Sequence, residues 1–136
     1  MPCAVTWQTR GVQQRLFGYV TAREYAESVD AIQRDARFDD LRYIVVDCTG
    51  ITGDDFDEDK LAEIATLGHV AHLSNVACPV AFVITAERIA ALIRKLFVEA
   101  LRDVMDIAVV ATHEQAHAWF DSLAQPRPHN LLLRTS

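Results

Sequence analysis

The chain has 136 residues, a length that fits one domain able to bury its own core. Hydrophobic residues make up 51% of it and charged residues 24%, the balance of a globular domain, which excludes disorder, a collagen-like repeat and a disulfide scaffold. With 13 basic and 19 acidic side chains the formal charge is −6, so we expect no nucleic-acid partner and no attraction to anionic lipid.

The location of the protein follows from its apolar runs and its cysteines. No apolar run approaches the roughly 20 residues of a membrane-spanning helix, and the start of the chain lacks the pattern of a signal peptide. We therefore expect a soluble, cytoplasmic protein with no membrane span. The cysteines are odd in number and form no Cys-x-x-Cys pair, which predicts reduced, mostly packed thiols at Cys3, Cys48 and Cys78.

The N-terminal part of the chain predicts a hairpin followed by a helix. Residues 4–9 and 12–20 are β-prone, and the Arg-Gly pair at 10–11 indicates a glycine turn between antiparallel strands. Thr21 and Glu24 have the spacing of a capping box, in which each side chain binds the other residue's backbone amide, so a helix should begin there. Its apolar stripe comprises Tyr25, Val29, Ile32 and Ala36.

Three further apolar runs predict interior strands of a parallel sheet. They cover residues 41–47, 77–84 and 107–111, and they lack the alternation of a strand with one wet face. The first ends on Asp47 and leads into an acidic loop at 53–59. The order β-β-α-β-α-β-α-β-α predicts an α/β fold, a mixed sheet of about five strands in which a hairpin precedes parallel β-α units, with about four helices.

Helical periodicity follows each of these runs. A second helix should carry Leu61, Ile64, Ala65, Gly68 and Ala71 on one face, and the acids before it favour its first turn. Thr85 should cap a third, amphipathic helix, and Thr112 a last one. We assign residues 1–124 to one domain and residues 125–136 to a C-terminal tail whose leucines at 131–133 invite docking on the domain or on a second subunit.

Three motifs carry a resemblance to a known family. They are a glycine followed by Thr-x-x-Glu at 21–24, Leu-Arg-Tyr-Ile-Val-Val-Asp at 41–47, and Thr-x-Glu-x-Ala-x-x-Trp-Phe at 112–120. Over about residues 10–123 the chain resembles the bacterial SpoIIAA-like proteins, relatives of the STAS fold of anti-sigma-factor antagonists. The resemblance implies that fold, and it places the chain in a superfamily with the lipid-binding CRAL-TRIO domains.

The resemblance fails at the residue that works in STAS antagonists. There a partner kinase phosphorylates a serine at the start of the second helix, in an Asp-Ser-Ser/Ala-Gly turn. Here Asp47 and the segment 49–52 match, but residues 53–57 read Gly-Asp-Asp-Phe-Asp, and no Ser or Thr lies between Gly53 and Ala65. The phosphoswitch serine is absent, and the acids could instead give a permanently negative surface that resembles a phosphorylated one.

We therefore expect a non-catalytic binding or regulatory module of the STAS-like type. Open α/β sheets bind their ligands where the strands end, and no reactive set of residues surrounds that edge. The expected partner is a protein, the module has no cofactor or bound metal, and it could form a homodimer. The candidate partner- or ligand-binding residues follow the central strand: Asp47, Cys48, Thr49, Thr52, Asp54, Asp55 and Asp57.

Two other functions compete with this hypothesis. The CRAL-TRIO relationship implies that the chain could bind a small apolar ligand or lipid. His113-Glu114-x-x-His117 has the spacing of a zinc hydrolase, in which two histidines bind the metal and the glutamate is the general base. A third protein ligand is missing from the extended pattern, and His129 lies in the tail. The same residues also fit a surface helix capped by Thr112, which we prefer.

Three smaller signals have structural readings that we prefer. His69 and His72 lie one helical turn apart and could pair as ligands or a pH sensor, but such histidines are usually edge-of-core side chains. The acids at 54–59 could hold a hard cation, but the calcium-loop pattern needs a glycine where Lys60 stands. Cys48 has no base near it in the sequence, so we expect a half-buried thiol.

Overall fold

A five-stranded mixed sheet organises the chain. The structure is a computed structural model that describes residues 2–72 and 78–124. The strands lie side by side in chain order, with the first pair antiparallel and all the others parallel. They are β1 (Cys3–Gln8), β2 (Gly11–Val20), β3 (Tyr43–Asp54), β4 (Val80–Val83) and β5 (Ile107–Val110). The predicted α/β fold is confirmed.

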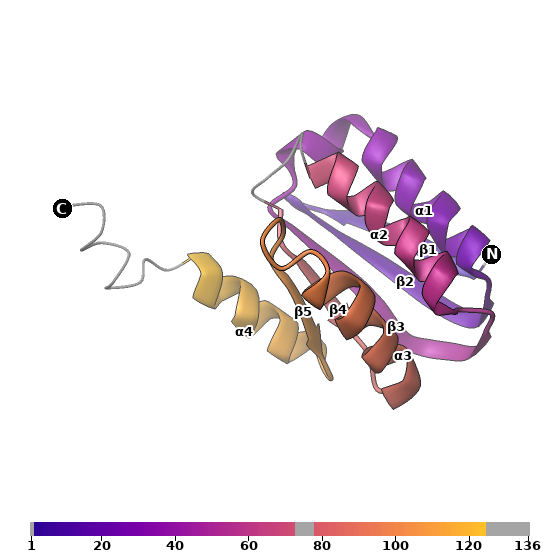
Figure 1. The fold of residues 1–136 in the computed structure, drawn as a ribbon. Helices are drawn as coiled ribbons and strands as arrows, with labels where there is room; N and C mark the ends of the chain where they lie inside the picture. The colour runs from indigo at the N-terminus through magenta and orange to yellow at the C-terminus, as the bar shows by residue number, and fades with distance from the viewer. Residues whose placement is uncertain (1, 73–77, 125–136) are drawn as a thin grey trace.

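Helices cover the two faces of this sheet unequally (Figure 1). Three lie together on one face, and the last lies on the other. A short 3-10 helix, η1, follows the first of them, and a π-helical stretch, η2, continues the third. The bounds are α1 (Ala22–Arg34), η1 (Ala36–Asp40), α2 (Glu58–His72), α3 (Glu87–Ile93), η2 (Arg94–Glu99) and α4 (His113–Ala124).

The larger core lies under α1, α2 and α3. Residues of the predicted stripes point into it, since Tyr25, Leu61 and Ile93 are all at most 3% exposed. The prediction for Ala36 is wrong: the extended backbone of Asp35 ends α1 at Arg34, and Ala36 lies exposed in η1. On the other face α4 places Ala116 against Val45, Ala81 and Val83. Since β3 and β4 are covered on both faces, their residues are apolar without alternation.

The hairpin is confirmed, but the reason for its glycine is different from the predicted one. The left-handed turn residue is Arg10, with φ of 60°. Gly11 already belongs to β2, where it pairs with Tyr43. The Tyr43 ring lies directly on Gly11, leaving no space for a side chain there. The glycine is therefore needed for a close approach between strands.

Two of the three predicted helix caps are confirmed. The Thr21 hydroxyl accepts from the Glu24 amide at 3.1 Å, and the Thr21 amide donates to the Glu24 carboxylate at 3.1 Å, which completes the capping box. Thr112 accepts from the Gln115 amide at 3.1 Å. The prediction for Thr85 is wrong: α3 begins one residue later, after Ala86, with no side-chain cap.

The prediction that the central strand ends at Asp47 is also wrong. β3 continues for seven more residues to Asp54, so it takes in residues 48–52 and the first two residues of the acidic loop expected at 53–59. The loop itself is confined to residues 55–57, because α2 already begins at Glu58. The pairing with β4 ends at Asp47, whereas the pairing with the longer β2 continues to Val20 opposite Asp54. Beyond Asp47 the strand has a neighbour on one side only. Its residues need not be apolar there, and the sequence therefore looks like a loop.

Parts of the expected architecture lie outside the described residues. These are the tail with its leucines at 131–133 and His129, and the side chains of Ala71, His69 and His72. Within 2–72 and 78–124, no helix combines the length and the apolar character needed to cross a bilayer.

Candidate functional site

The extension of β3 separates the candidate residues into two groups. Asp47, Cys48 and Thr49 lie in the middle of the strand, while Asp54 ends it and Asp57 immediately precedes α2. Seven residues of strand at about 3.3 Å each place Asp47 roughly 20 Å from Asp54. The structure therefore does not bring the predicted residues together in one loop.

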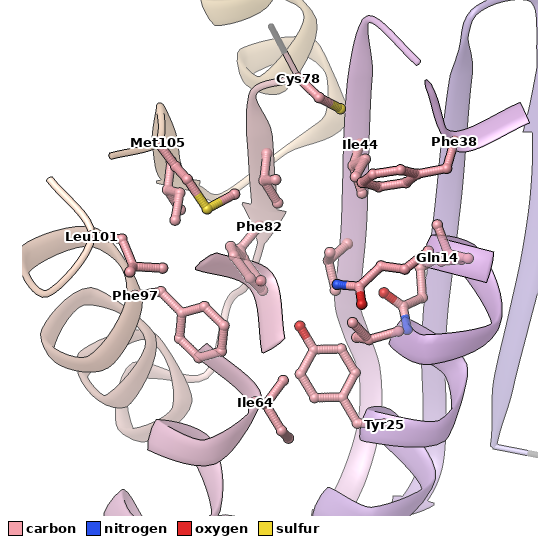
Figure 2. A pocket seen from close by; sticks show the side chains of 17 residues that line it. Gln14, Tyr25, Phe38, Ile44, Ile64, Cys78, Phe82, Phe97, Leu101 and Met105 are labelled. Atoms are coloured by element: carbon pink, nitrogen blue, oxygen red, sulfur yellow. The ribbon is translucent and has the colours of Figure 1, made fainter. Parts of the chain in front are cut away.

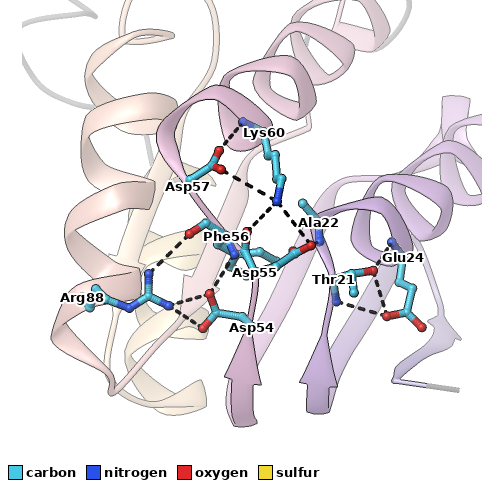
Figure 3. A network of polar contacts seen from close by, with 9 residues as sticks. All are labelled: Thr21, Ala22, Glu24, Asp54, Asp55, Phe56, Asp57, Lys60 and Arg88. Atoms are coloured by element: carbon cyan, nitrogen blue, oxygen red, sulfur yellow. Dashed lines mark hydrogen bonds and ion pairs between the residues drawn. The ribbon is translucent and has the colours of Figure 1, made fainter.

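The group at the end of β3 is an internal network of ion pairs and caps (Figure 3). The Arg88 guanidinium, at the start of α3, binds both carboxylate oxygens of Asp54. Asp54 also accepts from the Phe56 amide at 2.9 Å, and its side chain is only 7% exposed. Asp54 thus fixes the end of β3 to the first turn of α3.

Asp55 and Asp57 bind the starts of the other two helices. Asp55 accepts from the Ala22 amide in the first turn of α1 at 2.6 Å, and this bond, with a smaller contribution from nearby Lys60, lowers the pKa of Asp55. Asp57 accepts from the Lys60 amide at 2.8 Å, as a helix N-cap does. The Lys60 ammonium lies 3.4 Å from Asp55 and 3.8 Å from Asp57.

We call the exposed side chains at this end of the sheet the β3-end platform. It comprises Tyr19 near the end of β2, Thr52 near the end of β3, and Asp57, Lys60 and Arg88 of the network. Asp57, Lys60 and Arg88 are each about half exposed, at 55%, 47% and 58% of their side chains. One acid and two bases are therefore exposed on the platform, so its charge is mixed, which disfavours the permanently negative surface that the acids could have given.

Tyr19 is the member of the platform that sequence reasoning missed. It is 61% exposed, although it belongs to a strand whose apolar residues are otherwise packed. It pairs with Gly53, and a Cβ on that glycine would come within 2.9 Å of the Tyr19 ring. Large exposed aromatic rings are typical of protein contacts. The one sign of this contact in the sequence is Gly53, whose missing side chain makes room for the Tyr19 ring. The sequence does not reveal that the strand containing Tyr19 pairs with Gly53.

The group in the middle of β3 attaches α4 to the sheet. Asp47 accepts from the Thr49 amide at 2.9 Å and hydroxyl at 2.7 Å, and its second oxygen lies 2.8 Å from His113 Nε2. Burial raises the pKa of Asp47, but the hydrogen bonds from Thr49 and His113 outweigh it and hold that pKa below its ordinary value. Asp47 is therefore an ionised structural group that fixes the start of α4.

Cys48 points the opposite way, into the larger core. It is 5% exposed, more deeply buried than the half-buried thiol we predicted. Burial, with a contribution from the charge of Asp47, raises the pKa of the thiol to about 12. A thiol in this state is neither ionised nor accessible, which disfavours a nucleophilic role.

The two histidines of the zinc-like motif have separate partners. His113 binds Asp47, whereas His117 packs edge-on to the Tyr43 ring at 5.9 Å and near the Phe120 ring at 6.1 Å. Among the described residues, no group of three or more His, Cys, Asp or Glu side chains is placed to hold a metal. Within that part of the chain the motif fits the capped helix that we preferred.

An apolar cavity of about 80 Å³ lies between the sheet and the helices of the larger core (Figure 2). Its wall includes Tyr25, Phe82 and Phe97. Sites for drug-sized ligands usually measure about 300–1,000 Å³. The space is therefore too small for an acyl chain, which disfavours lipid carriage at this place.

Comparisons with known proteins bear on the fold. No family model matches the chain, and no curated protein matches it. Among solved structures, the chain resembles the anti-sigma factor antagonist SpoIIAA in its unphosphorylated form, with a TM-score of 0.55 and 19% sequence identity. The match covers 85% of this chain and 94% of that one. It confirms the SpoIIAA-like, STAS-related fold predicted from the motifs.

Proposed function

We propose that this chain is a non-catalytic regulatory module that binds a protein partner through the β3-end platform. The solved neighbour is described as an anti-sigma factor antagonist, a protein that acts on another protein. From that description we carry over only the class of partner. The phosphoswitch serine has no counterpart here, so the proposed binding does not depend on phosphorylation at that position.

The observation that supports the proposal is the construction of the platform. Asp54, Asp55 and Asp57 bind the starts of α3, α1 and α2 in turn, so three helices are held at one end of the sheet. A surface held this way loses little conformational entropy when a partner binds. The exposed Tyr19 ring and the half-exposed charges of Lys60 and Arg88 add an aromatic anchor and polar contacts.

Site-specific photo-crosslinking tests the proposal. A photoreactive residue replaces Thr52 on the platform in the full chain, expressed in the cells it comes from, and adducts are identified by mass spectrometry. The matched control carries the same residue at Arg34, which is 80% exposed at the far end of α1. We expect a discrete protein adduct from Thr52 that the control does not give.

The captured protein is then purified and its affinity measured. Tyr19→Ala should weaken binding about tenfold or more, because exposed aromatic anchors carry much of the energy of protein contacts. Glu27→Ala, which removes an exposed side chain of α1, should leave the affinity unchanged. Equal adducts from both positions, or a Tyr19→Ala variant that binds as the parent does, would contradict the proposal.

A further inference from the structure

Two polar atoms on the wall of the cavity in the larger core have no hydrogen-bond partner among the described residues. The Tyr25 side chain points into it (Figure 2), and the residue is 3% exposed. Nothing in the described part of the chain forms a hydrogen bond with the Tyr25 hydroxyl, although the Tyr25 ring packs near the Phe56 ring, with 6.2 Å between their centroids. A buried hydroxyl without a partner costs free energy, so this one needs an explanation.

Gln14 adds a second polar group to the same cavity wall. It is 1% exposed, and its amide nitrogen donates to the Ser28 hydroxyl at 2.8 Å. Its carbonyl oxygen accepts no hydrogen bond from the described residues. Together, Tyr25 offers a donor and Gln14 an acceptor, which is the complement of a single hydroxyl group.

The rest of the described wall is uncharged, and it is apolar apart from Gln33. Among the described residues that line the cavity there is no Asp, Glu, Lys, Arg or His. Cys78 does line the cavity, but burial raises the pKa of its thiol to about 12, so the thiol is protonated. A charged ligand would be strongly disfavoured in such surroundings, whereas a neutral, mainly apolar one is accommodated.

Gly68 keeps part of this space open. It lies in α2, where glycine is less favourable than alanine, and it forms part of the cavity wall. An ideal Cβ at Gly68 would meet no atom of the described residues within 4 Å. The helix thus carries an unfavourable residue where a side chain would enter the cavity.

We propose that this cavity binds a small neutral molecule, an alcohol or phenol no larger than a single aromatic ring, whose hydroxyl meets Tyr25 and Gln14. The apolar body of the molecule lies among Phe82, Phe97 and Ile64. A cavity of about 80 Å³ is of the order of the 150 Å³ apolar cavity known to bind benzene. This site is separate from the β3-end platform, and it does not depend on the proposed partner.

Phenol and toluene test this proposal as a matched pair, because they have the same size and only phenol has a hydroxyl. Binding of each is followed by NMR on the full chain at millimolar concentrations. We expect shifts at Tyr25, Phe82 and Phe97, and about fivefold tighter binding of phenol, the effect of one net hydrogen bond. In Tyr25→Phe the preference for phenol should fall, because only the bond to Gln14 remains, while toluene still binds.

Gly68→Leu is the second variant, since its side chain should fill the cavity and abolish binding of both probes. Failure of phenol to bind, equal affinity for phenol and toluene, or a preference that Tyr25→Phe leaves unchanged would each overturn the proposal. Shifts that persist in a folded Gly68→Leu variant would do so too, because they would mean binding elsewhere. If Gly68→Leu does not fold, the comparison of phenol and toluene binding between Tyr25→Phe and the parent is sufficient to test the proposal.

Discussion

The two faces of the sheet differ in how their helices are held. Under α1, α2 and α3, a continuous cluster contains completely buried side chains such as Leu61. Under α4, the buried cluster is small, and the aromatic rings of Trp119 and Phe120 are only partly covered. The Asp47–His113 pair adds a polar link there. The comparison teaches that apolar burial supplies the stability of the first face, while α4 should open at lower free energy.

The largest expected effect tests this difference directly. Leu61→Ala leaves a cavity in the first face and should lower the free energy of unfolding by about 3 kcal/mol. Phe120→Ala on the second face should cost about 1–2 kcal/mol, because part of that ring is exposed in the folded state. Urea denaturation of both variants measures the two values. Equal losses would break the comparison.

The next effect concerns the network that holds the first-face helices at one end. Asp54→Ala leaves the Phe56 amide and the Arg88 guanidinium without their partner, and should cost about 2 kcal/mol. Asp57→Ala removes only an exposed helix cap and should cost about 1 kcal/mol. The difference is measured by thermal or urea denaturation. A larger loss from Asp57→Ala would show that Asp54 is not the central residue of the network.

The sequence predicted the parts of the fold that depend on local patterns. The Thr21–Glu24 box and the apolar stripe with Tyr25 and Ile32 are set within one helical turn or two, and both are confirmed. The extension of β3 depends on a neighbour far away in the chain, since β2 pairs with it as far as Asp54. No local pattern records how long a partner strand is.

The candidate site shows the same limit. The sequence singled out Asp47 as a partner-binding residue and His113 as a possible zinc ligand. In the structure they contact each other, although they are 66 residues apart in the chain. Asp54 was expected to contact a partner protein, whereas it forms an ion pair with Arg88 of the same chain. Which charges remain exposed depends on tertiary contacts. The residue types therefore indicated where charge would gather without indicating what would neutralise it.

The attachment of α4 should depend on pH. The pKa of Asp47 is lowered in the folded state, so its ionised form favours folding. The contribution is complete above the unfolded value, about 3.9, and is lost as the pH falls through the folded value. Asp47→Asn should cost about 1–2 kcal/mol at neutral pH, from weakened hydrogen bonds to Thr49 and His113. That difference from the parent should shrink as the pH falls below the unfolded value.

Chemical denaturation at a series of pH values measures this difference, and hydrogen exchange of the α4 amides locates it. Asp30→Asn is the control, because the ion pair of Asp30 with Arg34 on α1 is exposed. Such pairs contribute little, so the variant should follow the parent at every pH. A pH-independent cost for Asp47→Asn would mean that its charge does not hold α4.

The smallest expected effect concerns the packing of the first face, which the cavity leaves incomplete. Gly68→Ala replaces a glycine inside α2, and its methyl group meets no described atom within 4 Å. Helix propensity alone predicts a gain of about 0.5–1 kcal/mol in the free energy of unfolding. The gain is measured by urea denaturation without added ligand. A lower free energy of unfolding for Gly68→Ala would mean that the space beside Gly68 is already filled. The first face would then be packed more tightly than the cavity suggests, and its contrast with the loosely attached α4 would be larger.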